Sequence, residues 1–171
     1  MGRTTVAAAT VARGRIFAMM DADGDGVISA HDYLSRVDRA VQATGRSEDD
    51  PLVVAARGQA HKAWGAMDAN GDGKLTFEEY DAWVGADKFD NICRFALGSL
   101  FDLADADGDG ALDKTEFTML RTALNNAPGN AASAFNALDT DGDGLVVRDE
   151  YLASIRSYVI GDASPMGEAL Y

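Results

Sequence analysis

Four polar, glycine-rich stretches interrupt the apolar pattern of the chain, at residues 21–32, 68–79, 105–116 and 139–150. Each has an aromatic residue four positions before it, another immediately after it, and an aliphatic residue at its eighth place. These residues are Phe17, Tyr33 and Ile28; Trp64, Tyr80 and Leu75; Phe101, Phe117 and Leu112; and Phe135, Tyr151 and Val146. The repeat predicts four helix–loop–helix units. The aromatic residues would start the buried helix faces, and the aliphatic residues would pair across neighbouring loops, Leu112 with Val146.

Capping residues and turn residues place the helices between these stretches. We expect the first helix over about residues 5–20, where apolar positions recur with helical spacing. Asp50 and Pro51 should be the N-cap and first residue of a helix that runs to Met67. A further helix should lead into the third stretch. The remaining helix ends and turns are expected near residues 45, 85–87, 126–129 and 161.

The oxygen-bearing residues of each stretch stand at the places that a calcium loop requires. Calcium takes about six to eight oxygens, and such a loop supplies them from side chains at places one, three, five and twelve and from the seventh carbonyl. A glycine at the sixth place, such as Gly110, permits the sharp turn. The expected side-chain ligands are Asp21, Asp23, Asp25 and Asp32; Asp68, Asn70, Asp72 and Glu79; Asp105, Asp107, Asp109 and Glu116; and Asp139, Asp141, Asp143 and Glu150. The expected carbonyl ligands belong to Val27, Lys74, Ala111 and Leu145.

The four stretches, loops one to four in chain order, differ in what they offer an ion. At the ninth place loop two has Thr76 and loop three has Asp113, whereas loop four has Val147, so water must fill that place. Loop one ends in Asp32, one methylene shorter than glutamate, and is expected to reach the ion with one oxygen only. Six-fold coordination suits magnesium better than calcium. We therefore expect three to four calcium ions, with magnesium as an alternative ion at loop one.

With these loops and flanks, the chain resembles the EF-hand superfamily over essentially its whole length. The long connection over residues 33–67 and the terminal Asp32 of loop one are similar to features of sarcoplasmic calcium-binding proteins and bacterial calerythrin. The resemblance implies an all-α fold in which two EF-hand pairs, at residues 1–90 and 91–171, pack as lobes of one compact globule. In that family the second loop is commonly degenerate, whereas residues 68–79 keep every ligand-bearing place.

The charge of the chain narrows the choice of partners. Its 28 Asp and Glu outnumber its 15 Lys and Arg, for a formal net charge of −13 at pH 7. Such a field disfavours nucleic acids and anionic membranes and favours cations. No apolar run approaches the ~20 residues that span a membrane, and the single cysteine, Cys93, is expected to be a small buried side chain. We expect a soluble, cytoplasmic monomer.

Two functions remain open, and neither is enzymatic. The sequence has no nucleophile–base pair, phosphate loop or Cys/His cluster, so we expect no catalytic or cofactor-binding residue. A calcium buffer would store the ion. A calcium sensor would expose apolar surface and regulate a partner protein that the sequence does not identify. Target-binding grooves rely on flexible methionine, and the few methionines beside the loops (Met19, Met20, Met67 and Met119) favour the buffer.

Overall fold

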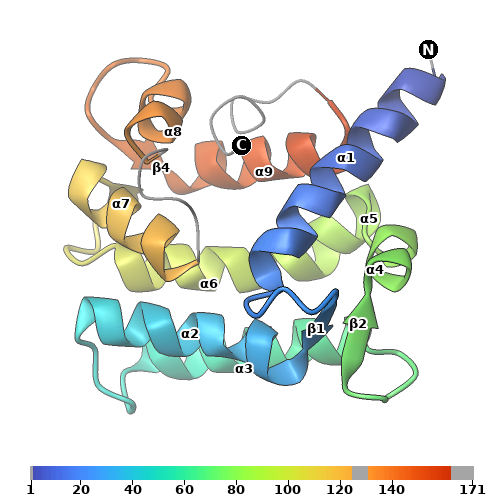
Figure 1. The fold of residues 1–171 in the computed structure, drawn as a ribbon. Helices are drawn as coiled ribbons and strands as arrows, with labels where there is room; N and C mark the ends of the chain where they lie inside the picture. Colours follow the sequence, from blue (N-terminus) through green and yellow to red (C-terminus); the bar gives the residue numbers. More distant parts are fainter. Residues whose placement is uncertain (1, 125–130, 163–171) are drawn as a thin grey trace.

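Four helix–loop–helix units follow one another in the computed structural model, which describes residues 2–124 and 131–162 (Figure 1). Its elements in chain order are α1 (Gly2–Met20), β1 (Val27–Ser29), α2 (Ala30–Thr44), α3 (Pro51–Met67), β2 (Lys74–Thr76), α4 (Phe77–Trp83), α5 (Ala86–Lys88), the π-helix η1 (Phe89–Cys93), α6 (Arg94–Ala104), β3 (Ala111–Leu112), α7 (Lys114–Ala123), α8 (Ala131–Leu138), β4 (Val146–Val147) and α9 (Arg148–Ile160). The all-α class is confirmed. None of the helices in the described ranges is long and apolar enough to cross a membrane.

The loops are joined in pairs by short antiparallel strands. β1 pairs with β2 so that Ile28 faces Leu75, and β3 pairs with β4 so that Leu112 faces Val146. All four side chains are fully buried. The expected pairing of the eighth places is therefore confirmed, and each pair fixes two loops back to back.

The helix ends follow the capping residues closely. The Asp50 carboxylate accepts a hydrogen bond from the Leu52 N–H at 2.9 Å, and Pro51 is the first residue of α3. Gly45, with a φ of 69°, ends α2 in the left-handed conformation that glycine adopts without strain. α4 ends at Trp83, slightly before the expected 85–87, because Val84 already has an extended backbone. The turn expected at residues 126–129 lies outside the described residues.

The helix that leads into loop three differs from the expectation. The sequence predicted one regular helix, whereas the structure has the short α5, one π-helical segment at Phe89–Cys93 and then α6. A π-turn widens the backbone spacing without changing which residues are apolar. Hydrophobic periodicity therefore gives no sign of it.

Aromatic residues that flank the loops form much of the core. All eight of those predicted from the repeat are buried. Phe117 packs edge-on against Phe135 with ring centroids 5.6 Å apart, and Phe101 lies 5.6 Å from Tyr151. Contacts of this kind hold each entering helix against an exit helix of the same lobe.

The two lobes pack against each other across several helices. In Figure 1, α6 crosses the middle of the molecule, with α2 and α3 on one side and α9 on the other. α3 packs on α6, α2 on α7, and α1 on α9. Arg13 of α1 donates to the Val159 carbonyl of α9 at 3.0 Å and forms an ion pair with Asp81 of α4 at 3.1 Å. The expected compact globule is confirmed.

Candidate metal centres

Each loop turns back on itself at its sixth residue. These glycines, Gly26, Gly73, Gly110 and Gly144, have φ values between 76° and 90°. Their N–H groups each donate to one oxygen of the first aspartate, over 2.9–3.0 Å. One oxygen of the first carboxylate is thereby held by the backbone.

The other oxygen of the first carboxylate is available to coordinate an ion. In loops two and three, Oδ1 of Asp68 and of Asp105 is buried and has no hydrogen-bond donor among the residues that the structure describes. A buried anionic oxygen without a donor costs free energy that a bound cation would remove. Both oxygens are hard donors of the kind that calcium prefers. The residues present therefore fit the metal that the loop pattern predicts.

Backbone N–H groups also orient the third and fifth side chains. In all four loops the fifth residue's N–H donates to the third side chain, over 3.1–3.2 Å, and the seventh residue's N–H donates to the fifth, over 2.9–3.0 Å. Asn70 makes the same contact through its amide oxygen as the aspartates at the third place of the other loops. The substitution therefore preserves the ligand geometry while removing one negative charge.

Carboxylate oxygens converge in three of the loops. Within the described part of the chain, groups of three acidic residues bring oxygens within 4.8 Å of one another; they are Asp21, Asp23 and Asp25; Asp105, Asp107 and Glu116; and Asp139, Asp141 and Asp143. Asp32, Asp109 and Glu150 are not members of these groups, and loop two, which has Asn70, forms none. The expected ligands thus lie at their loops, but they converge to different degrees.

Crowding of like charges and hydrogen bonds shift the pKa values of two aspartates in loop four in opposite directions. The Asp143 N–H lowers the pKa of Asp141 below its ordinary value. The pKa of Asp143 is raised: the Leu145 N–H opposes the rise, but desolvation and the neighbouring carboxylates of Asp141 and Asp139 outweigh it. One carboxylate of the pair therefore holds its proton more firmly than an isolated aspartate.

The twelfth residue of each loop has a second task, which the sequence analysis missed. The ninth residue is the N-cap of the exit helix and the twelfth is its N3 residue, so the two can form a capping box. Ser29 accepts from the Asp32 N–H at 3.1 Å while Asp32 accepts from the Ser29 N–H at 2.9 Å. Thr76 with Glu79, and Asp113 with Glu116, do the same. The Ser-x-x-Asp spacing would have revealed Ser29.

Loop four has only half of this box. The Val147 N–H donates to Glu150 at 3.2 Å, but the valine side chain has no oxygen to return the bond to the Glu150 N–H. The N-terminus of α9 therefore lacks a side-chain cap that the other three exit helices have.

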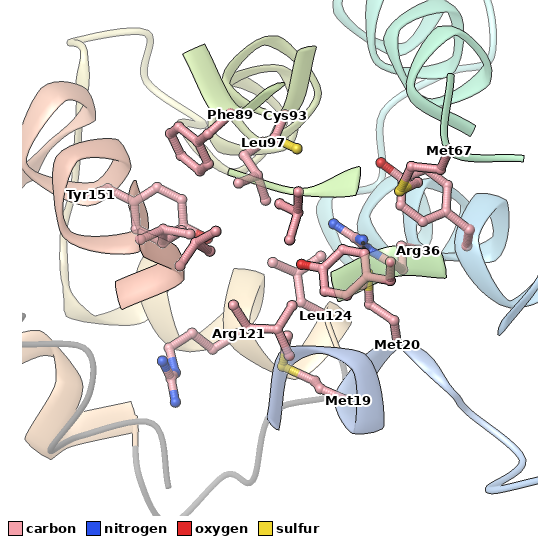
Figure 2. A pocket seen from close by; sticks show the side chains of 16 residues that line it. Met19, Met20, Arg36, Met67, Phe89, Cys93, Leu97, Arg121, Leu124 and Tyr151 are labelled. Carbon is pink, nitrogen blue, oxygen red and sulfur yellow. Dashed lines mark hydrogen bonds between the residues drawn. The ribbon is translucent and has the colours of Figure 1, made fainter. Parts of the chain in front are cut away.

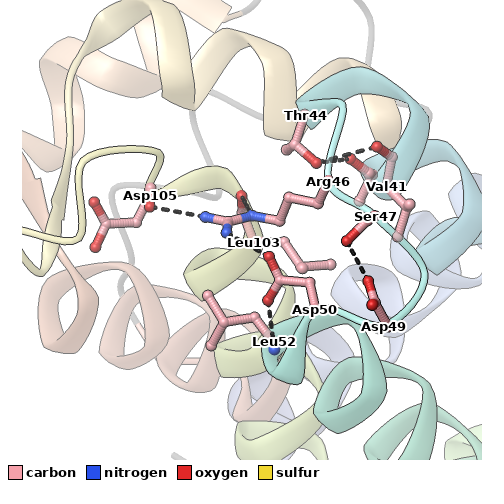
Figure 3. A network of polar contacts seen from close by, with 10 residues as sticks. Val41, Thr44, Arg46, Ser47, Asp49, Asp50, Leu52, Leu103 and Asp105 are labelled. Carbon is pink, nitrogen blue, oxygen red and sulfur yellow. Dashed lines mark hydrogen bonds and ion pairs between the residues drawn. The ribbon is translucent and has the colours of Figure 1, made fainter.

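An arginine from the connection between α2 and α3 binds the backbone where α6 ends and loop three begins (Figure 3). Arg46 donates to the Leu103 carbonyl at 3.0 Å and to the Asp105 carbonyl at 3.2 Å, both at the end of α6. Its third nitrogen forms an ion pair with Asp50 at 3.1 Å. A residue of the N-terminal lobe thus positions the first ligand of a loop in the other lobe. The sequence does not predict this role for Arg46, because it is a single arginine in a polar connection with no recognisable motif.

The chain is similar to calcium-binding proteins over most of its length. The family model described as an EF-hand domain pair matches residues 94–156, and the one described as an EF hand matches residues 15–35 and 65–83. Calerythrin from Saccharopolyspora erythraea is 26% identical over 85% of this chain and 88% of its own length. A calcium-binding protein of Streptomyces coelicolor, solved in a study of prokaryotic calcium-mediated regulation, is 31% identical with a TM-score of 0.73, over 89% of this chain and 99% of that one.

Enzymes match only in part. Calcium-dependent protein kinase 33 of Arabidopsis thaliana is 33% identical over 61% of this chain, but the match covers 20% of the kinase. The similarity to this kinase is therefore confined to about a fifth of the kinase's length.

The incomplete capping box of loop four generates a stability prediction. Val147→Ser should raise the free energy of unfolding by about 1 kcal/mol, because serine can accept from the Glu150 N–H. Val147→Ala, which removes the same partly exposed apolar group without adding a cap, is the control and should give no gain. Urea unfolding in saturating calcium measures both variants. Equal stability of the serine and alanine variants would contradict the assignment.

The contacts of Arg46 generate an affinity prediction. Because Asp50 already neutralises the guanidinium, its effect on loop three should come from positioning and not from charge. Arg46→Ala should weaken calcium binding at loop three by about three- to tenfold, the equivalent of one or two lost hydrogen bonds. Arg46→Lys keeps the positive charge but lacks the planar guanidinium that reaches both carbonyls, so it should lose nearly as much calcium affinity.

The amide resonances of Gly110 and Gly144 report loops three and four separately during a calcium titration. Loop four is the internal control and should be unchanged. Tighter binding in Arg46→Ala would mean that repulsion between the guanidinium and the ion dominates, contrary to the prediction.

Proposed function

Because the chain belongs to the EF-hand superfamily, with calerythrin-like features, we propose that it stores calcium as a buffer. Calcium binding is the activity that its loops support. The storage role is the inference, and so is its place in the cytoplasm as a monomer. We assign the side chains at places one, three, five and twelve of all four loops as ligands, together with the seventh carbonyl. Four sites would then fill, loop one with the least preference for calcium over magnesium.

The observation that carries the storage role is the packing of the lobes. A sensor presents an apolar groove when its helices open. Here the helix faces that would line such a groove are covered by the other lobe: α2 and α3 lie on α7 and α6. Met20 and Met67, which border loops one and two, are buried in this shared core. Exposing them would require separation of the lobes, which favours storage.

A sensor is the second candidate, favoured by one comparison. The Streptomyces coelicolor protein was solved in a study of calcium-mediated regulation. If this chain acts similarly, calcium must increase its exposed apolar surface and so create a site for a partner protein.

Fluorescence of a hydrophobic dye separates the two roles. A buffer should bind the dye only in chelator, where the acidic loops repel one another and the core loosens. With calcium or with magnesium the signal should fall to the level of a folded globule. A signal that calcium raises and magnesium does not, on protein with full helix content in both, would contradict storage and support the sensor.

The length of Asp32 generates a prediction about ion selectivity. Asp32→Glu should tighten calcium binding at loop one on the order of tenfold, because a second carboxylate oxygen can reach the ion. Magnesium binding there should change little or weaken. Glu116→Asp in loop three is the reciprocal control and should shift selectivity toward magnesium. Calcium titrations with and without excess magnesium measure both, and an unchanged selectivity in Asp32→Glu would refute the idea.

A further inference from the structure

A partly open cavity lies between the two lobes, and none of the calcium loops' ligands lines it. Its volume is about 80 Å³, and most of its lining is apolar (Figure 2). An engineered cavity of roughly 150 Å³ is large enough to bind benzene. Methionines line part of the wall (Met19, Met20 and Met67), and their flexible side chains can widen it for a ligand of a few carbon atoms.

Two buried arginines line this cavity, Arg36 of α2 and Arg121 of α7. Arg36 is only 7% exposed. Its guanidinium contacts the Met20 sulfur at 3.1 Å and lies over the Tyr33 ring, 4.8 Å from the centroid. Within the described ranges, no carboxylate lies within ion-pair distance of Arg36, and no acidic residue lines the cavity. An arginine stays charged in proteins, so a thioether and an aromatic face are weak compensation for its lost water.

The other polar groups on the wall do not supply a negative charge. Burial raises the pKa of the Cys93 thiol to about 12, so it stays neutral at ordinary pH, and a tyrosine hydroxyl is ordinarily neutral there as well. The cavity is therefore apolar with a net positive charge.

The wall also contains the irregular turn of the fold. Phe89 and Cys93, the first and last residues of the π-helix, both line the cavity. Segments of this kind cost backbone energy and occur often at functional sites. Here the irregular turn forms part of the cavity lining.

We propose that this cavity binds a small monocarboxylate with a short apolar tail, whose carboxylate pairs with Arg36. The planar guanidinium matches a carboxylate in a two-bond arrangement, and the tail would occupy the apolar remainder. This site lies outside the calcium loops and does not depend on the storage role.

The cavity wall is built from residues that adjoin the loops. Met20 and Tyr33 stand immediately before and after loop one, Met67 and Tyr80 immediately before and after loop two, and Tyr151 follows loop four. Ordering of the loops by calcium would fix these side chains. Carboxylate binding is therefore coupled to calcium binding, and each should tighten the other by the same factor, about fivefold or more.

The test uses the full chain with saturating calcium and two probes, butyrate and hexanoate, measured by ligand-observed NMR and calorimetry. The neutral 1-butanol and the cationic butylamine are controls of similar tail length. The proposal expects saturable carboxylate binding at least about tenfold tighter than that of either control, the equivalent of one charge-assisted hydrogen bond. No saturable binding would mean that the cavity does not take a carboxylate, and equal affinity for the alcohol would mean that Arg36 does not select one. Either result would overturn the proposal.

Three variants decide the role of Arg36. Arg36→Met, an apolar replacement of similar length that should fold at least as stably, should lose carboxylate affinity by about tenfold or more. Arg36→Lys should keep part of it. Arg57→Met removes a surface arginine that pairs with Asp38 and Glu48 and should change nothing. If Arg36→Met binds the probes as the wild type does, the proposal is wrong.

A calcium titration of the same wild-type samples tests coupling separately from storage. Saturating hexanoate should tighten calcium binding by the factor with which calcium tightens hexanoate. Calcium binding that is normal without the probe and unchanged with it would overturn the coupling while leaving the storage role intact.

Discussion

Repulsion among carboxylates held close together is the constraint on which this protein depends. Among the described residues, loops one, three and four each bring three acidic side chains together, and the backbone N–H groups of the loops satisfy only some of their oxygens. Asp68 and Asp105 each keep a buried oxygen without a donor in the described part of the chain. Hydrogen bonds thus orient the ligands but do not neutralise them, and a divalent cation completes the arrangement.

The rest of the fold connects the loops to one another and to the helices that follow them. Ile28 with Leu75, and Leu112 with Val146, tie the loops in pairs, while the capping boxes tie each of the first three loops to its exit helix. Arg46 then links the connection in one lobe to the first ligand of loop three in the other. Calcium at a loop would therefore order more than the loop's own residues. The lobes share one core, which is the physical reason to favour storage over exposure of a groove.

Much of this could be predicted from the sequence because the signals are local. The ligand residues follow a fixed spacing, and flanking aromatic residues such as Phe101 mark the buried faces of the helices. Asp50 and Pro51 are an N-cap and a first helical residue, so they predict where α3 begins. Features that depend on distant packing gave no signal. The π-helix at Phe89–Cys93 leaves the apolar pattern unchanged, and the contacts of Arg46 and Arg36 exist only after the lobes meet. Ser29 was recognisable by its capping spacing but was overlooked.

Thermal unfolding in calcium and in chelator tests the central claim most directly. If the loops require a cation to relieve their repulsion, each occupied site adds about 2.7 kcal/mol of stability when calcium is at ~100 times its Kd. The melting temperature should then rise steeply with calcium, and the protein in chelator should be partly unfolded. Identical melting curves in calcium and in chelator would contradict the account.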